Sequence, residues 1–297
     1  MNTIDTSPSD NGRGSDAWAC SWTHFSVDRR SPGYCRVTFD HPPINTVTAT
    51  TVAELAEVVD LIEQDHDLNV VVFDSANPEF YLAHYDTEGD PGKTVSMPPG
   101  PTGMHPWLDL TARLSRAPVV SIASIRGRAR GAGSEFALAC DLRLAGDKAI
   151  LAQFEVGTGV VPGGGPLARL PRLIGRGRAL EVLLAADDID AALAERYGYV
   201  NRVVPDDQLE QETDRIARRL ASFDKQAIAE TKAFVDATTL PADDELPPAL
   251  GAFFASAARP ASQARLAALA SHGLGSDSEL ERRLGELVTL GGPRSDP

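Results

Sequence analysis

Residues 121–184 read SIASIRGRARGAGSEFALACDLRLAGDKAILAQFEVGTGVVPGGGPLARLPRLIGRGRALEVLL. They begin as an apolar strand that ends at Ile125, turn through glycines between Gly127 and Gly133, and enter a helix near Ser134. Such a turn leaves main-chain N–H groups without partners at the start of a helix, where the helix dipole adds partial positive charge. The segment therefore predicts a place where a developing oxyanion is stabilised.

Strands and helices alternate around this segment, which predicts an α/β fold. Two strand patterns, Trp22–Val27 and Tyr34–Phe39, flank turn residues that include Pro32 and Gly33 and indicate an antiparallel hairpin. From Thr48 to Gln64 apolar residues recur every three or four positions, as in a helix with one buried face. The alternation continues with strands at Val70–Phe73, Val119–Ile122 and Leu142–Leu144, and with helices at Leu108–Arg116 and Gly131–Cys140.

The second half of the chain changes to helical patterns. After PGGGP at residues 162–166, helices are predicted over Arg178–Ala185, Ala191–Tyr197, Leu209–Ser222 and Leu250–Ala270, the last interrupted by Pro260. Residues 1–17 are polar and typical of a disordered lead. We therefore expect a core that carries the active site at residues 18–205 and a C-terminal helical region at residues 206–297.

Composition narrows the classes of function. Among 297 residues, 28 Lys and Arg stand against 42 Asp and Glu, a net charge of −14 that disfavours a nucleic-acid partner. Three widely spaced cysteines favour a reducing compartment over a disulfide framework. Neither a secretion signal nor a stretch of about 18 apolar residues is apparent. We expect a cytoplasmic protein without a membrane partner.

Several motifs that would indicate other chemistry are incomplete. GKT at residues 92–94 lacks the leading glycine and the helix of a phosphate-binding loop. GAGSEF at residues 131–136 lacks the third glycine of a dinucleotide-binding turn. No GxSxG elbow is present, and the six histidines form no HExxH motif or pair at metal-ligand spacing. The sequence therefore indicates neither a serine hydrolase nor a metal site.

Longer stretches of the chain resemble the crotonase superfamily, the enoyl-CoA hydratase/isomerase family, from about Val37 to Val204. The matching pieces are HPPIN (41–45), FYLAHYD (80–86), IRGRARGAGSEFALACDLRLA (125–145), LAQFEVGTGVVPGGGPLARLPRLIG (151–175) and ADDIDAALAERYGYVNRVV (186–204). The resemblance implies an α/β crotonase-like spiral of ββα units that carries the active site, and a C-terminal helical trimerisation/cap region that forms subunit contacts and part of the binding cleft. It also implies an acyl-CoA thioester substrate, no cofactor beyond the CoA of that substrate, and a homotrimer or dimer of trimers.

The resemblance implies roles for individual residues. A thioester oxygen would lie between the main-chain N–H groups of His84 and Ala132. Hydratases of the family use two glutamates twenty residues apart, and Glu135 and Glu155 have that separation. Glu135 would help activate water for attack at the β-carbon, and Glu155 would deliver or remove the proton at the α-carbon. Because two such carboxyls cannot both be comfortably ionised, we expect one of them to have a raised pKa. Further substrate contacts are expected from Ile44, Ala83, Tyr85, Gly131, Gly133, Phe154 and Gly163.

The sequence departs from the family pattern in ways that leave alternatives open. The usual Gly-Ala-Asp of the first turn is replaced by His84-Tyr85-Asp86 after Ala83. The His84 side chain would narrow the acyl tunnel, take part in the chemistry or merely pack. Arg126, Arg128 and Arg130 would pair with carboxylates or contact CoA phosphates. The expected activity is reversible syn addition of water to a 2-enoyl-CoA. The alternatives are isomerisation, decarboxylation, carbon–carbon or thioester cleavage, or a catalytically silent acyl-CoA-binding scaffold.

Overall fold

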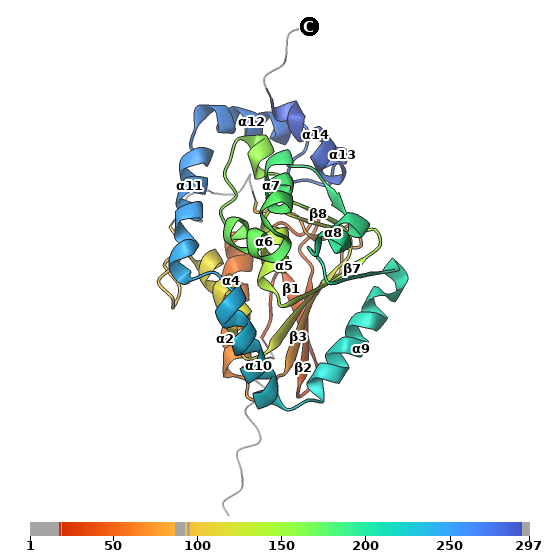
Figure 1. Ribbon diagram of the computed structural model, residues 1–297. Helices are drawn as coiled ribbons and strands as arrows, with labels where there is room; N and C mark the ends of the chain where they lie inside the picture. Colours follow the sequence, from red (N-terminus) through yellow and green to blue (C-terminus); the bar gives the residue numbers. More distant parts are fainter. Residues whose placement is uncertain (1–17, 19, 87–92, 94–95, 293–297) are drawn as a thin grey trace, which may run out of the picture.

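Consecutive strands of the chain enter two different sheets (Figure 1). The computed structural model describes residue 18, residues 20–86, residue 93 and residues 96–292. Its six-stranded sheet has the order β1 (Phe25–Ser31), β2 (Tyr34–Phe39), β3 (Val70–Ser75), β5 (Val120–Ile125), β7 (Leu142–Gly146), β10 (Arg202–Val204). The four-stranded sheet has the order β4 (Phe80–Leu82), β6 (Arg128–Arg130), β8 (Ile150–Ala152), β9 (Ile189–Asp190). Each successive pair of strands, β3–β4, β5–β6 and β7–β8, thus adds one strand to each sheet.

The N-terminal hairpin is confirmed, with shifted bounds. β1 and β2 pair antiparallel from Phe25 opposite Phe39 to Ser31 opposite Tyr34. Only Pro32 and Gly33 are left for the turn, because Asp28–Ser31, which the sequence assigns to the turn, continue the first strand. From β2 onward the neighbours β3, β5, β7 and β10 are parallel.

The helices lie between and after these strands. They are α2 (Ala49–Gln64), α4 (Pro106–Arg116), α5 (Ala132–Ala139), α6 (Pro166–Ile174), α7 (Arg176–Ala185), α8 (Ala191–Tyr197), α9 (Leu209–Ala221), α10 (Lys225–Thr239), α11 (Pro247–Ala257), α12 (Pro260–Ser271), α13 (Glu279–Arg282) and α14 (Leu284–Leu287). Short 3₁₀ turns are η1 (Glu155–Thr158), η2 (Asp206–Gln208), η3 (Asp243–Glu245) and η4 (Val288–Gly291). The helix expected at Leu250–Ala270 forms as two helices, α11 and α12. Pro260, where an interruption was expected, is the first residue of α12.

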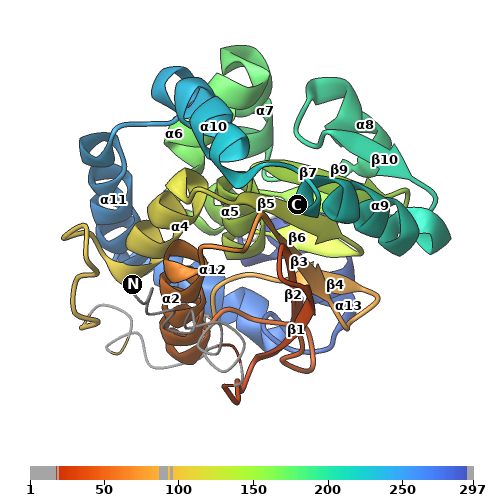
Figure 2. The ribbon, with the colours of Figure 1, turned by 90° about the horizontal axis from the view of Figure 1, so that it is seen from below.

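Two helix layers cover the six-stranded sheet. Val71 and Phe73 of β3 face the main core, which contains Leu55 of α2 and Phe136 of α5. The alternate residues of β3 face the other side, where Leu209 and other residues of α9 pack. Figure 2 shows α9 on one side of this sheet and α2 and α4 on the other. The parallel strands are therefore buried on both faces, as their continuous apolar runs predict.

The C-terminal helices reach the end of the molecule where the small sheet lies. α12, α13 and α14 lie together at the top of Figure 1, and α11 runs down from them along one side. Leu269, Leu280, Leu284 and Val288 from this segment form a separate apolar cluster with Phe154, which follows β8. The predicted lead at residues 1–17 lies outside the described residues, as do residues 87–92 and 94–95. The division at residue 205 stays a prediction.

Candidate active site

The small sheet brings three separate turns of the chain together. β4, β6 and β8 are neighbouring parallel strands, so their carboxyl ends lie at the same edge. His84 follows β4, Ala132 follows β6 at the start of α5, and Glu155 follows β8. Parallel strand pairing therefore brings together residues that are far apart in the sequence. It does so at the sheet edge where α/β folds commonly bind ligands.

The turn between β6 and α5 exposes the start of a helix. Gly131 has φ +49° and ψ −121°, a conformation that favours glycine, and its carbonyl accepts from the N–H of Glu135 at 2.9 Å. Ala132, which replaces a common glycine, does not have a positive φ, so its side chain causes no backbone strain. Neither its N–H nor that of His84 donates to another described residue. Both amides are thus available at the edge of the small sheet.

Glu135 is held by two donors from different parts of the chain. Its Oε2 accepts from the indole Nε1–H of Trp107 at 2.9 Å, and its Oε1 accepts from the main-chain N–H of Gly164 at 2.7 Å. Burial raises the pKa of Glu135 to about 7, although both hydrogen bonds act in the opposite direction. The ionised carboxylate of Glu135 therefore has two fixed hydrogen-bond donors. Its pKa of about 7 allows it to gain and lose a proton near neutral pH.

Glu155 lies on η1 and holds its proton more tightly. Burial, followed by the negative charge of Glu135, raises the pKa of Glu155 to about 8. With its amide nitrogen facing Glu155, Gln153 donates to both carboxylate oxygens at 3.2 Å and accepts from Ser134 Oγ at 3.1 Å. The two glutamates thus repel each other when both are ionised, which agrees with the expectation of a raised pKa.

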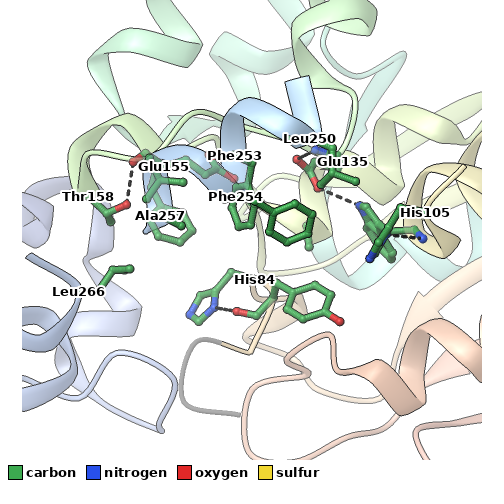
Figure 3. Close-up of a pocket in the computed structure, with 18 residues that line it drawn as sticks. His84, His105, Glu135, Glu155, Thr158, Leu250, Phe253, Phe254, Ala257 and Leu266 are labelled. Carbon is green, nitrogen blue, oxygen red and sulfur yellow. Dashed lines mark hydrogen bonds between the residues drawn. The ribbon is translucent and has the colours of Figure 1, made fainter. Parts of the chain in front are cut away.

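A cavity of about 120 Å³ adjoins both glutamates. In the view of Figure 3, Glu155 lies to the left and Glu135 to the right of Phe253 and Phe254 of α11, and His84 lies below them. The other residues that line the cavity are mostly apolar, which suits the binding of an acyl chain. The lining residues are His84, Tyr85, His105, Trp107, Gly131, Ala132, Glu135, Phe154, Glu155, Thr158, Val160, Gly163, Gly164, Leu250, Phe253, Phe254, Ala257 and Leu266.

The structure gathers most, but not all, of the predicted site residues. His84, Tyr85, Gly131, Ala132, Glu135, Phe154, Glu155 and Gly163 line the cavity. Ile44 and Ala83 do not, because they pack with Phe80 in a small buried cluster. Gly133 is also behind the wall: a β-carbon there would lie 2.0 Å from the carbonyl oxygen of Leu82. The lack of a side chain at Gly133 therefore allows close contact between α5 and β4, and Gly133 does not line the cavity.

Three contributions to the site were not anticipated from the sequence. Trp107 and Gly164 hold Glu135, and Glu281 pairs with His84. Apolar residues of α11 also line the cavity, namely Leu250, Phe253, Phe254 and Ala257. PGGGP was the only available signal for Gly164. No local pattern marks Trp107 or Glu281, since each acts through a partner far away in the sequence.

The three alternating arginines pair with groups of the protein itself. Arg130 is buried and contacts Asp188 with two nitrogens, at 2.6 and 2.7 Å. Arg126 lies 3.1 Å from Asp206. Arg128 Nε donates to the carbonyl oxygen of Arg282 at 3.0 Å. Carboxylate and main-chain pairing therefore accounts for these side chains in the structure.

The described residues contain neither a cluster of metal-ligating side chains nor a membrane-spanning helix. Across residues 18, 20–86, 93 and 96–292, no group of three or more His, Cys, Asp or Glu is placed to hold a metal ion. Within the same ranges, every helix is too short or too polar to span a bilayer.

Comparison with known proteins gives consistent matches. The family model described as enoyl-CoA hydratase/isomerase matches residues 29–250. The crystal structure of "a putative enoyl-CoA hydratase from Streptomyces avermitilis" is 38% identical, has a TM-score of 0.87, and covers 93% of this chain and 99% of that one. The carnitinyl-CoA dehydratase of Citrobacter koseri is 33% identical over 220 residues, which are 73% of this chain and 80% of the relative. The short-chain-enoyl-CoA hydratase of Clostridium acetobutylicum is 34% identical over 189 residues, 63% of this chain and 71% of the relative. The chain therefore belongs to the enoyl-CoA hydratase/isomerase family and has the crotonase fold.

Proposed function

We propose that this chain is a lyase that adds water reversibly, with syn geometry, to the double bond of a 2-enoyl-CoA thioester. The observation that carries the proposal is the pair of buried carboxyls, Glu135 and Glu155, on one cavity with different proton affinities. Hydration needs both a base and an acid near two adjacent carbons. Because the two carboxyls have different pKa values, the one with the lower pKa can act as the base and the other as the acid near neutral pH.

The thioester oxygen is the part of the substrate that gains charge. We assign its hydrogen bonds to the N–H of Ala132 and to the N–H of His84 in the Ala83–Asp86 turn. The N-terminal dipole of α5 points at the same place. Loss of one oxyanion donor typically costs about 2.7–4 kcal/mol of transition-state stabilisation, so two donors would contribute a large part of the rate enhancement.

The proton transfers follow from the order of the two pKa values. Ionised Glu135 accepts a proton from water as the water oxygen attacks the β-carbon. The carbon–carbon π electrons move toward the carbonyl and form an enolate, whose α-carbon then takes the proton of Glu155. Glu135 ends protonated and Glu155 ionised, and exchange of protons with solvent restores the starting forms. Because both carboxyls approach the same face of the acyl group, oxygen and hydrogen are added on one side.

The cavity wall indicates the kind of acyl group. Phe154, Phe253, Phe254 and Leu266 are apolar and line the same cavity as the two carboxyls. We assign this space to the acyl chain, with CoA carried in as part of the substrate and no separate cofactor. A cytoplasmic location and assembly as a homotrimer or dimer of trimers belong to the same proposal.

The test is loss of conjugated-enoyl absorbance with purified protein and a panel of 2-enoyl-CoA thioesters, with acyl-CoA binding measured by calorimetry on the same preparation. Glu135→Gln should abolish hydration and still allow some exchange of the α-proton. Glu155→Gln should lose both reactions. Unchanged turnover in Glu135→Gln contradicts the two-carboxyl assignment. Binding without turnover across the panel favours the silent scaffold, and α-proton exchange without hydration in the wild type favours another enolate reaction.

A further inference from the structure

His84 and Glu281 form a buried pair between residues 197 positions apart. His84 Nε2 lies 2.7 Å from Glu281 Oε1, and the side chains are 2% and 1% exposed. Glu281 belongs to α13, near the C-terminal end of the chain, whereas His84 belongs to the turn that follows β4. The C-terminal segment therefore contacts the proposed oxyanion turn directly.

Both ring nitrogens of His84 face acceptors. Nδ1 lies 2.7 Å from the carbonyl oxygen of Tyr85, which can only accept, so Nδ1 carries a hydrogen (Figure 3). Nε2 faces the carboxylate of Glu281. Burial lowers the pKa of His84, but the charge and hydrogen bond of Glu281 and the hydrogen bond to the Tyr85 carbonyl outweigh it, and the pKa is raised. Both partners of the ring therefore favour its charged form.

Glu281 is itself fixed from several directions. Its Oε1 also accepts from the N–H of Gly275 at 2.7 Å, and its own N–H donates to Ser278 Oγ at 3.1 Å. Its carbonyl oxygen accepts from the guanidinium of Arg130 on β6. The neighbouring Leu280 packs in the apolar cluster that includes Phe154. The carboxylate thus has little freedom to follow a moving histidine.

The pair adjoins the reacting groups. A β-carbon placed on Gly131 would lie 3.3 Å from His84 Cβ and 3.1 Å from Glu155 Oε1. His84 and Glu155 therefore both lie next to Gly131. The His84 ring also contacts the Phe154 ring, with centroids 5.4 Å apart. His84 lines the cavity, whereas Glu281 lies behind it. His84 therefore lies between Glu281 and the cavity.

We propose that Glu281 is a positioning residue of the active site, which holds His84 as an imidazolium and thereby fixes the turn that binds the thioester oxygen. The kinetic part of this inference rests on the proposed function, while the protonation of His84 does not. The C-terminal segment then completes the site from behind. The charged groups nearest His84 are Glu281 on α13, Arg130 on β6 and Glu155 on η1, so each is considered in the test.

The first readout is the protonation of His84, followed by ¹⁵N NMR of histidine-labelled full-length protein from pH 6 to 9. The His84 signals are assigned by their absence from His84→Gln. In the wild type the ring should titrate at higher pH than an ordinary histidine. In Glu281→Gln its titration should move down by at least one pH unit, since the amide carries no charge. Glu155→Gln should change it less. Glu279→Gln removes an exposed carboxylate from the same helix, one that contacts Arg283, and should change nothing.

The second readout is steady-state kinetics of enoyl-CoA hydration. Glu281→Gln should lower kcat about tenfold with a smaller change in KM, because a displaced oxyanion donor weakens the transition state more than the bound substrate. In a chain that already carries His84→Gln, adding Glu281→Gln should lower kcat by only about twofold or less. Glu281 acts through the His84 side chain, which that background lacks. Glu281→Asp should recover part of the wild-type rate and titration.

The outcomes separate the inference from the proposed function. Equal losses from Glu281→Gln with and without His84, or an unchanged His84 titration, would overturn the positioning role. If the wild type binds acyl-CoA but hydrates no enoyl-CoA, the proposed function fails while the NMR result still decides whether Glu281 holds His84 charged. Should Glu281→Gln fail to fold, His84→Gln combined with Glu281→Gln replaces the ion pair by two neutral amides, and Glu281→Asp keeps the charge.

Discussion

The main-chain N–H of Gly164 lies 2.7 Å from Oε1 of Glu135, and a β-carbon on Gly164 would lie 1.9 Å from Oε2 of the same carboxylate. The same β-carbon would lie 2.4 Å from Nε1 of Trp107. Only glycine can therefore bring a main-chain donor this close to the carboxylate while the indole occupies its other side. The glycine-rich loop before α6 is in this respect part of the catalytic geometry.

Replacing Gly164 by Ala should move Glu135 and lower kcat at least about 100-fold, because displacing a catalytic group by about 1 Å can cost that much. The measurement is the rate of enoyl-CoA hydration together with the melting temperature. Gly177→Ala is the matched control, since a β-carbon at this exposed position of α7 meets nothing within 4 Å. It should keep the wild-type rate and gain up to about 1 kcal/mol of stability. A Gly164→Ala enzyme with near-normal kcat would contradict the role of this donor.

Trp107→Phe keeps an aromatic ring and removes one of the two donors to Glu135. Because the lost N–H stabilises the ionised carboxylate, the pKa of Glu135 should rise further, by about one unit. The acidic limb of the activity profile should shift upward by the same amount, so the variant should lose more activity at pH 6.5 than at pH 8.5. A uniform loss at all pH values would instead indicate a packing defect. Melting curves of both proteins serve as the control for folding.

Local patterns were sufficient to predict much of the fold. The β-branched run at Val70–Phe73 and the periodic helix at 48–64 are specified by their own residues, and both occur where expected. The strand β6 inside the predicted glycine turn was missed, because three residues between glycines carry too little signal. α10 was missed for a different reason: none of its residues is buried, so it shows no strong apolar face.

The candidate site was predictable only where its residues follow a strand or share a motif. Glu135 and Glu155 are marked by their spacing and context. Glu281 is not, because its function depends on a contact across 197 residues that no local pattern encodes. Ile44, which was expected to contact the substrate, packs with Phe80 in a small buried cluster and does not line the cavity.

The pH dependence of hydration should be bell-shaped with its maximum between about pH 7 and pH 8. Below about 7 Glu135 takes up a proton and no longer acts as the base, and above about 8 Glu155 loses the proton that the α-carbon needs. Because the groups interact, the two limbs report values that belong to the pair. Initial rates from pH 5.5 to 9.5 measure the profile. A profile that is flat from pH 6 to 9 would exclude this pair as acid and base.

Glu155→Gln should stabilise the folded chain at high pH while removing activity. The folded-state pKa of Glu155, about 8, lies above the usual value of 4.5, so the folded chain binds this proton more tightly than the unfolded chain does. The stabilisation from the neutral carboxyl is complete below about pH 4.5 and is lost as the pH rises through about 8. The Gln variant does not ionise there. Its melting temperature should therefore exceed that of the wild type by about 2 to 3 °C at pH 9, a difference of between about 1 and 2 kcal/mol for a chain of this size. The difference should be small or reversed at pH 5.

Glu57→Gln, on the exposed side of α2, is the control and should give the same difference at both pH values. A Glu155→Gln variant that is less stable than the wild type at pH 9 by as much as at pH 5 would mean that Glu155 is not buried as a neutral acid.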